Sequence, residues 1–229
     1  MRSRWMLGVA FGLLGSVPAL GQSLSSISNQ DAAQALEDAL VQGARMAVSQ
    51  LSAANGFLGN QEVRIPLPSA LGKIEKGMRL IGQGQQADEL VTNMNRAAEL
   101  AVKEATPLLT DAVKQMSVED AKGILTGGDD SATQFFERKT SEPLALRFLP
   151  IVKQVTAKLQ LAQQYNQFAG QGARFGVIHK EDADLDGYVT RKALDGLFLV
   201  IAEQERAIRK DPAAAATGVA QKVFSALKR

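Results

Sequence analysis

The chain has 229 residues, of which 26 are basic, 24 are acidic and 45% are hydrophobic. This length allows one domain or two small ones, and the share of hydrophobic residues is too high for an intrinsically disordered chain. There is no cysteine, which excludes disulfides and a lipid anchor attached to cysteine. A packed core must therefore hold the fold together.

The first 21 residues have the pattern of a secretory signal peptide. Arg2 and Arg4 precede an apolar run, and Ala19 and Gly21 place small residues at the two positions that a signal peptidase recognises. The apolar run is shorter than the roughly 20 residues that span a membrane. We therefore expect cleavage after Gly21, a periplasmic location, and a helical domain over residues 22–229 without a transmembrane segment.

The mature chain is expected to be formally neutral. Removal of the signal peptide takes away two arginines and no acidic residue, which leaves 24 basic and 24 acidic side chains. A neutral chain has no overall attraction for nucleic acid. His179 is the only histidine, and together with the absence of cysteine this argues against the usual zinc and copper sites. We expect no cofactor.

Apolar residues at helical spacing dominate the rest of the chain. Nine helices are expected, at residues 28–54, 69–81, 86–105, 107–116, 118–126, 129–139, 141–168, 190–209 and 212–229. Residues 56–68 contain two glycines and two prolines, which indicates an extended loop. Pro143 is interpreted as part of the first turn of the seventh helix, which Pro150 is expected to kink. The sequence therefore predicts an all-α single domain of eight or nine helices.

Paired acidic residues precede the sixth predicted helix. Asp129 and Asp130 follow two glycines, and such glycines can hold a phosphate, but here carboxylates occupy the place of the anion. Paired carboxylates can also hold a divalent metal or do acid–base work. We interpret the pair as helix caps, in the same way that Ser117 and Asp120 form a capping box before the fifth helix.

The stretch DADLDGYVT, residues 182–190, begins like a calcium loop of the EF-hand type. Asp182, Asp184 and Asp186 stand at positions 1, 3 and 5, and a glycine follows at position 6. Position 12, which needs a bidentate glutamate, is Ala193. These aspartates are the calcium candidate of the chain, with an incomplete ligand set. We therefore expect no metal site, and we prefer to interpret the stretch as a solvated acidic turn that adds negative charge before the next helix.

A mixed run of charges ends the eighth predicted helix. Arg206, Arg209 and Lys210 are balanced by Glu203 and Glu205. This pattern indicates a solvated helical face rather than a patch that binds nucleic acid.

Several short segments form a series along the chain. They are residues 64–68, 94–99, 120–122, 124–130, 132–134, 188–190, 193–198, 208–209 and 211–212. In this order they resemble the bacterial family called domain of unknown function 4197, and they cover essentially the whole expected mature chain. The resemblance implies an exported, mostly helical protein, and it implies no activity.

These segments carry polar side chains that a plain helical core does not require. They are Arg64, Asn95, Arg96, Glu99, Asp129, Asp130, Thr133 and Gln134. One interpretation is structural: the groups join helices through caps and salt bridges, and Arg96 pairs with Asp129 or Asp130. The other is a ligand site in a polar cleft around Arg96, Asp129 and Asp130.

We find no catalytic motif such as Gly-x-Ser-x-Gly in the sequence. We therefore expect an exported cell-envelope protein, most simply a non-catalytic binding or interaction protein whose partner is an envelope protein or a small molecule. The alternatives are a small-ligand-binding protein that uses the polar cleft around Arg96, Asp129 and Asp130, and a carboxylate-based hydrolase. An exposed apolar patch would favour the interaction protein, and a concave polar pocket would favour the ligand-binding protein.

Overall fold

The computed structural model of the protein describes residues 29–69, 84–159, 161–166 and 183–211, together with residues 71, 79, 80 and 82. Several predicted features lie outside the described residues. They are the signal peptide at residues 1–21, most of the helix at residues 69–81, His179, Asp182 and the helix at residues 212–229.

The described residues form six α-helices and one 3₁₀ turn, and no strand occurs among them. The elements are α1 (Asn29–Ser52), α3 (Gly84–Ala101), η2 (Val102–Glu104), α4 (Ala105–Lys114), α5 (Val118–Thr126), α6 (Ser131–Thr156) and α8 (Leu185–Lys210). Residues 161–166 are also helical. The all-α fold class is confirmed. No helix in this part of the chain combines the length and the apolar character needed to cross a bilayer.

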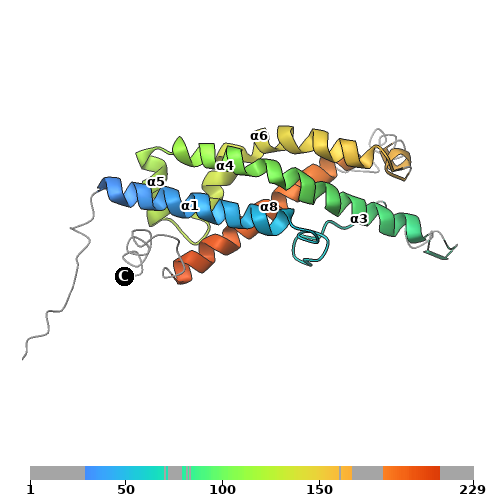
Figure 1. The fold of residues 1–229 in the computed structure, drawn as a ribbon, viewed down its shortest axis with the longest axis horizontal. Coiled ribbons are helices and arrows are strands. Elements are labelled where there is room, and N and C mark those ends of the chain that lie inside the picture. The colour runs from blue at the N-terminus through green and yellow to red at the C-terminus, as the bar shows by residue number, and fades with distance from the viewer. Residues whose placement is uncertain are drawn as a thin grey trace, which may run out of the picture.

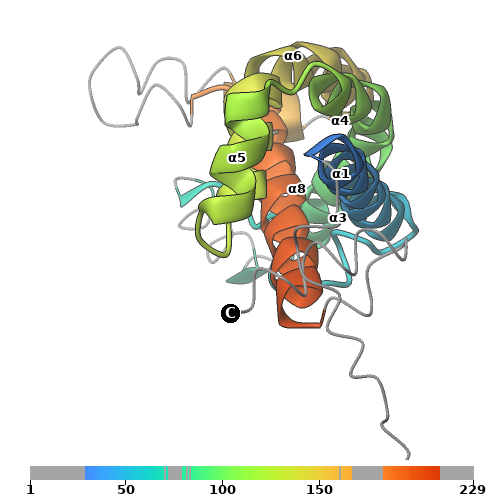
Figure 2. The same ribbon diagram turned by 90° about the vertical axis from the view of Figure 1, so that its left-hand side faces the viewer.

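The helices form an elongated bundle around one hydrophobic core (Figure 1). α8 packs against α1, α3 and α6, so the core is built around it. The turn η2 joins α3 to α4, and α4 packs on α1 and α6. Figure 2 shows the short helix α5 at the end of the bundle that faces the viewer. This end holds the start of α6 as well, and it contains the cavities described below.

Helical periodicity predicts which side chains face the core, and on α1 and α8 most of them are buried, while Ile208 is partly buried. The buried ones include Leu36, Leu40, Ala44, Ala47, Val48 and Leu51 on α1, and Leu194, Leu197, Phe198 and Ile201 on α8. The neighbours Phe135 and Phe136 on α6 are also buried, and their rings meet edge to face with centroids 5.6 Å apart. Aromatic rings in this geometry contribute large buried area, so they fix α6 in the core.

α6 is a single helix where the sequence predicted two. It continues through Pro143 and Pro150, each of which removes a backbone donor. Leu144, Phe148 and Val152 are fully buried on the same helix. The burial of these side chains compensates for the two missing hydrogen bonds, because tertiary packing outweighs the local preference of proline.

The capping box before α5 is confirmed. The Ser117 hydroxyl accepts a hydrogen bond from Asp120 N at 3.0 Å, and the Asp120 carboxylate accepts one from Ser117 N at 3.3 Å. Hydrogen bonding from Ser117 holds the pKa of Asp120 below its ordinary value, and nearby Lys139 acts in the same direction. The capping box in the sequence therefore predicted the start of α5 correctly.

α8 begins at Leu185, earlier than the predicted start at residue 190. Asp184 is the N-cap residue, and its carboxylate accepts a hydrogen bond from Asp186 N at 3.1 Å. Asp186 therefore lies in the first turn of α8, and it accepts a hydrogen bond from Thr156. Its charge lies at the helix N-terminus, where the helix dipole favours it. Within the described ranges, no three acidic or histidine side chains gather as metal ligands.

Candidate functional site

The eight candidate residues fall into two groups. Arg64, Asn95, Arg96 and Glu99 lie on α3 and on the loop that follows α1, whereas Asp129, Asp130, Thr133 and Gln134 lie at the start of α6. Arg96 donates hydrogen bonds to Glu99 and Asn55, and Asp130 accepts one from Arg206. The predicted pairing of Arg96 with Asp129 or Asp130 is therefore wrong.

Asn95 holds the loop at residues 53–68 on α3. It is fully buried, and it binds Ile65 as a neighbouring strand would: Oδ1 accepts from Ile65 N at 2.8 Å, and Nδ2 donates to Ile65 O at 2.9 Å. Nδ2 also donates to Val91 O at 2.8 Å. Since buried polar groups need partners, these bonds fix the loop on α3. The side chain of Arg64, one residue before Ile65, is exposed to solvent.

Glu99 and Arg96 fix the turn at the end of α1. Glu99 accepts hydrogen bonds from Phe57 N and Leu58 N, both at 3.2 Å, and pairs with Arg96 at 2.6 Å. Arg96 also donates to Asn55 Oδ1 at 2.8 Å. Asn55 has φ of 68°, a left-handed conformation that asparagine tolerates better than most residues. The polar atoms of this group are used by the fold itself, so we assign the group a structural role.

The second group is organised by Glu205 of α8, which the sequence did not single out. Its carboxylate accepts from Ala132 N at 2.9 Å, from Thr133 N at 2.8 Å and from Thr133 Oγ1 at 2.9 Å. The first turn of a helix leaves such donors without partners, so Glu205 caps α6 from a different helix. Asp130 makes no capping bond with its side chain, contrary to the prediction. It pairs instead with Arg206 at 3.0 Å.

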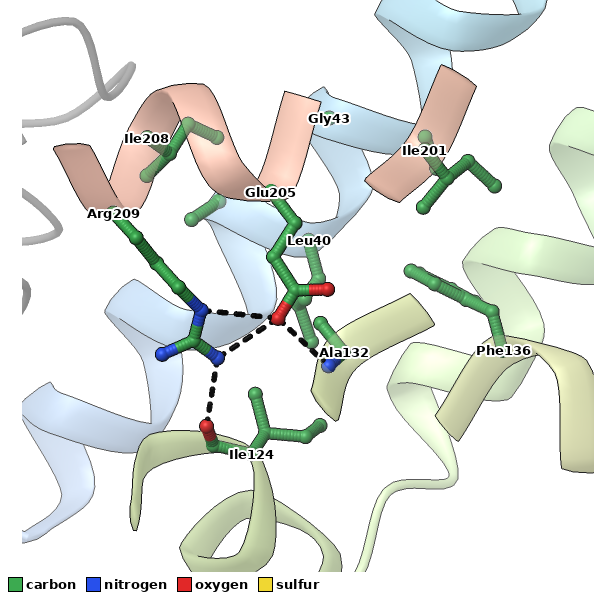
Figure 3. A pocket seen from close by; sticks show the side chains of 11 residues that line it. Leu40, Gly43, Ile124, Ala132, Phe136, Ile201, Glu205, Ile208 and Arg209 are labelled. Atoms are coloured by element: carbon green, nitrogen blue, oxygen red, sulfur yellow. Dashed lines mark hydrogen bonds and ion pairs between the residues drawn. The ribbon is translucent and has the colours of Figure 1, made fainter. Parts of the chain in front are cut away.

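Arg209 lies one turn after Glu205 and pairs with it at 2.8 Å (Figure 3). Its Nη2 also donates to Ile124 O, at the end of α5, at 2.9 Å and to Ser131 Oγ at 2.8 Å. The side chains of Arg209 and Glu205 are only 14% and 6% exposed. The prediction of a solvated helical face is therefore wrong at these two positions.

A small apolar pocket lies beside this ion pair, between α1, α5, α6 and α8 (Figure 3). Its volume is about 30 Å³. Leu40, Gly43, Phe136, Ile201 and Ile208 form much of its wall, and Ile124 of α5 completes it. A cavity of this size has room for about one water molecule.

A larger polar cleft of about 500 Å³ lies between α5 and the start of α6. Asp129, Asp130 and Gln134 of the predicted site line it, together with Glu119, Asp120 and Arg138. Four carboxylates and one guanidinium line this cleft, and two of the carboxylates, Asp120 and Asp130, pair with Lys139 and Arg206. The cleft therefore keeps a weak net negative charge. The volume is within the range of about 300–1,000 Å³ that small-molecule sites occupy.

Three glycines also line the polar cleft: Gly123, Gly127 and Gly128. At Gly127 an added Cβ would lie 2.6 Å from Gly123 O, so close packing requires glycine there. At Gly123 and Gly128 an added Cβ would meet no atom within 4 Å. These two positions therefore border open space and accept a larger side chain without a clash.

The structure thus brings together Asp129, Asp130 and Gln134, and it places Thr133 beneath them against Glu205. Arg96 belongs to the other group, so the cleft differs from the one predicted around Arg96, Asp129 and Asp130. The candidate functional site is therefore the polar cleft between α5 and the start of α6. The first group, on α3 and the loop after α1, is not part of it.

A family model described as "Protein of unknown function (DUF4197)" matches residues 26–225. Comparison with curated proteins and comparison with solved structures give no match. The matched residues include all of the described helices and every residue that lines the polar cleft. The resemblance read from the short segments is confirmed over most of the chain. This chain therefore belongs to the DUF4197 family.

Proposed function

We propose that the protein is exported to the periplasm and acts there as a non-catalytic binding protein, with the polar cleft between α5 and α6 as its ligand site. Export is supported by the basic and apolar pattern of residues 1–21 and by the small residues before the expected cleavage point. The chain also contains no cysteine, so its fold does not depend on the redox state of the compartment.

The observation that carries the binding role is the polar cleft itself. It is large enough for a small molecule or for one side chain of a partner, and several polar groups converge on it. Its carboxylates are Glu119, Asp120, Asp129 and Asp130. Arg138 opposes them in the lining, and Lys139 and Arg206 pair with Asp120 and Asp130, so a weak net negative charge remains. This charge favours a neutral or cationic ligand over an anion.

The exposed apolar side chains give less support to an interaction surface. The large ones among the described residues are Met46, Leu80, Leu100, Val118, Leu146 and Leu199. They come from different elements of the fold, and single exposed apolar residues are normal on a soluble domain. The cleft is therefore the better-supported binding feature.

The hydrolase alternative has weaker support than binding. A hydrolase of this kind would need two carboxylates directed at one substrate atom. Asp130 is instead paired with Arg206 at 3.0 Å, and both side chains are about half exposed. This arrangement suits the recognition of a charged group better than proton transfer.

A substitution that fills the cleft tests the binding role. Gly128→Leu adds a side chain at the wall of the cleft, where an added Cβ meets nothing within 4 Å. Thr126→Leu is the matched control, because Thr126 is exposed and does not line the cleft. We expect spermidine, a small polycation, to bind the wild type and Thr126→Leu in calorimetry, and to bind Gly128→Leu about tenfold more weakly.

Native mass spectrometry of the gently purified protein complements this titration. We expect a co-purifying molecule on the wild type and on Thr126→Leu, and less of it on Gly128→Leu. Bare polypeptide in all three proteins, together with no binding of spermidine, would reject the binding role of the cleft. Export is tested separately: the periplasmic fraction should contain a chain that begins at Gln22.

A further inference from the structure

Ile124 separates the polar cleft from the apolar pocket. Among the described residues it alone lines both cavities, and it is the one residue of α5 that is buried. An outward movement of α5 would remove this side chain from the wall. The two cavities would then become one site with an apolar floor and a polar rim.

α5 buries few of its side chains in the bundle, although Asp120 pairs with Lys139 of α6 at 3.5 Å. It has nine residues and buries Ile124, whereas α4, with ten residues, buries three. Val118 in its first turn is 80% exposed. At its other end, Ile124 O accepts hydrogen bonds from Arg209 and Ser131. A short helix is marginal on its own in water, and elements with few buried contacts open at a lower free energy than the whole protein unfolds.

The pocket under α5 is shaped by small residues of α1. Ala39, Gly43 and Ala44 line it, and an added Cβ at Gly43 would lie 3.9 Å from Gln204 Cβ and 4.0 Å from Ile208 Cδ1. At about 30 Å³ the pocket is too small for a ligand group while Ile124 is in place. When Ile124 leaves, the vacated volume is lined mainly by apolar side chains, which suits an aliphatic chain.

The rim of the combined site carries the carboxylates of the polar cleft, among them Asp129 and Asp130. An apolar floor next to a negatively charged rim is complementary to a molecule with an alkyl chain and a cationic head. We propose that α5 is a gate, and that its opening creates a site for a cationic amphiphile whose chain replaces Ile124. This inference rests on the proposed binding role of the cleft, and it adds the class of ligand and the moving element.

Calorimetry with three probes on the mature protein tests the ligand class. The probes are dodecyltrimethylammonium below its micellar concentration, dodecanoate as an anion with the same alkyl chain, and spermidine as a cation without such a chain. We expect dodecyltrimethylammonium to bind more tightly than either of the others. Equal binding of dodecanoate would overturn the assignment of a cationic head.

Substitutions on α1 test the position of the alkyl chain. Gly43→Leu fills the apolar pocket, so it should weaken binding of dodecyltrimethylammonium about tenfold and leave spermidine unaffected. Gln50→Leu adds the same side chain at an exposed position of α1 and should change neither affinity. Gly43→Ala serves as a milder variant if Gly43→Leu folds poorly. An effect of Gln50→Leu equal to that of Gly43→Leu would overturn the assignment of the pocket.

Hydrogen exchange tests the gate. The amides of α5 should exchange faster than those of α6 and α8, and they should exchange faster still when bound dodecyltrimethylammonium keeps Ile124 out of the pocket. Amides of α5 that exchange as slowly as those of α6 would reject the gate. If spermidine binds and Gly128→Leu weakens it, while dodecyltrimethylammonium gains nothing from its chain, the cleft remains the binding site and only the gate fails.

Discussion

Glu205 and Arg209, one turn apart on α8, join the end of α5 to the start of α6. Glu205 accepts the backbone hydrogen bonds of Ala132 and Thr133, and Arg209 donates to the carbonyl of Ile124. The two side chains also pair with each other at 2.8 Å in a position that is largely shielded from solvent. One ion pair thus satisfies both helix ends at the corner between α5 and α6.

Removal of one member of this pair should strongly destabilise the protein. Glu205→Ala leaves the Arg209 guanidinium buried without its partner and removes the cap of α6, so we expect a loss of about 3–5 kcal/mol in the free energy of unfolding. Arg206→Ala is the control, because its pair with Asp130 is 46% and 47% exposed and should contribute about 0–1 kcal/mol. Denaturation with urea measures both. Equal losses for the two variants would contradict the capping role.

Asn95→Ala should loosen the loop at residues 53–68. The substitution leaves the N–H and the carbonyl of Ile65 without their partners in a buried position, which should cost about 2 kcal/mol or more. Asn93→Ala is the matched control, because Asn93 donates only one bond, to Glu89 O, at an exposed position. Its effect should stay within about 0.5 kcal/mol. Similar effects of the two variants in urea denaturation would show that Asn95 does not anchor the loop.

Two glycines within helices should respond to alanine with opposite signs. At Gly196 an added Cβ would lie 2.7 Å from Phe57 Cε1 and 3.2 Å from Val63 Cβ, so Gly196→Ala should destabilise the protein by about 1–3 kcal/mol. At Gly123 the same atom meets nothing within 4 Å, so Gly123→Ala should stabilise α5 by up to about 1 kcal/mol. Thermal unfolding measures both, and a stable Gly196→Ala protein would contradict the tight contact between α8 and the loop.

The pair Glu62 and Glu203 should make stability depend on pH. Partial burial raises the pKa of Glu203, and the neighbouring carboxyl of Glu62 raises it further, while Arg206 opposes the shift. Because the pKa is raised in the folded state, the contribution to stability is present at acidic pH and is lost as pH rises through that pKa. Glu62→Gln should reduce this loss. Urea denaturation over about pH 4 to 7, where glutamates titrate, measures the slope; an unchanged slope in the variant would refute the coupling.

Much of the fold could be predicted because local signals and tertiary packing agree. The apolar residues of α1 and the capping box at Ser117 indicated the elements that the structure contains. Pro143 indicated a helix start that does not occur, because α6 continues through it. Local propensity reports the cost of a proline, but it does not report the burial of Leu144 and Phe148 that compensates for it.

The candidate site could be predicted only in part. Spacing along the chain cannot show that Arg96 and Asp130 bind different partners, because each pairing depends on how the helices pack. The burial of Glu205 could have been predicted from the sequence, because Glu205 falls between Ile201 and Ile208 on the apolar face of α8. A charge in register with an apolar face indicates a buried pair, and this signal was hidden by the other charges in the same stretch.

The corner between α5 and α6 also has a consequence for how the chain reaches its native state. Ala132 N and its acceptor Glu205 are 73 positions apart in the sequence, and synthesis makes α5 and α6 long before α8. Until α8 arrives, the first turn of α6 lacks its acceptor, and the core that α8 completes stays open to water. Such distant contacts cannot form until most of the chain exists. Late completion of the core would serve the export that we propose, because a secretion channel threads a chain that has not yet folded.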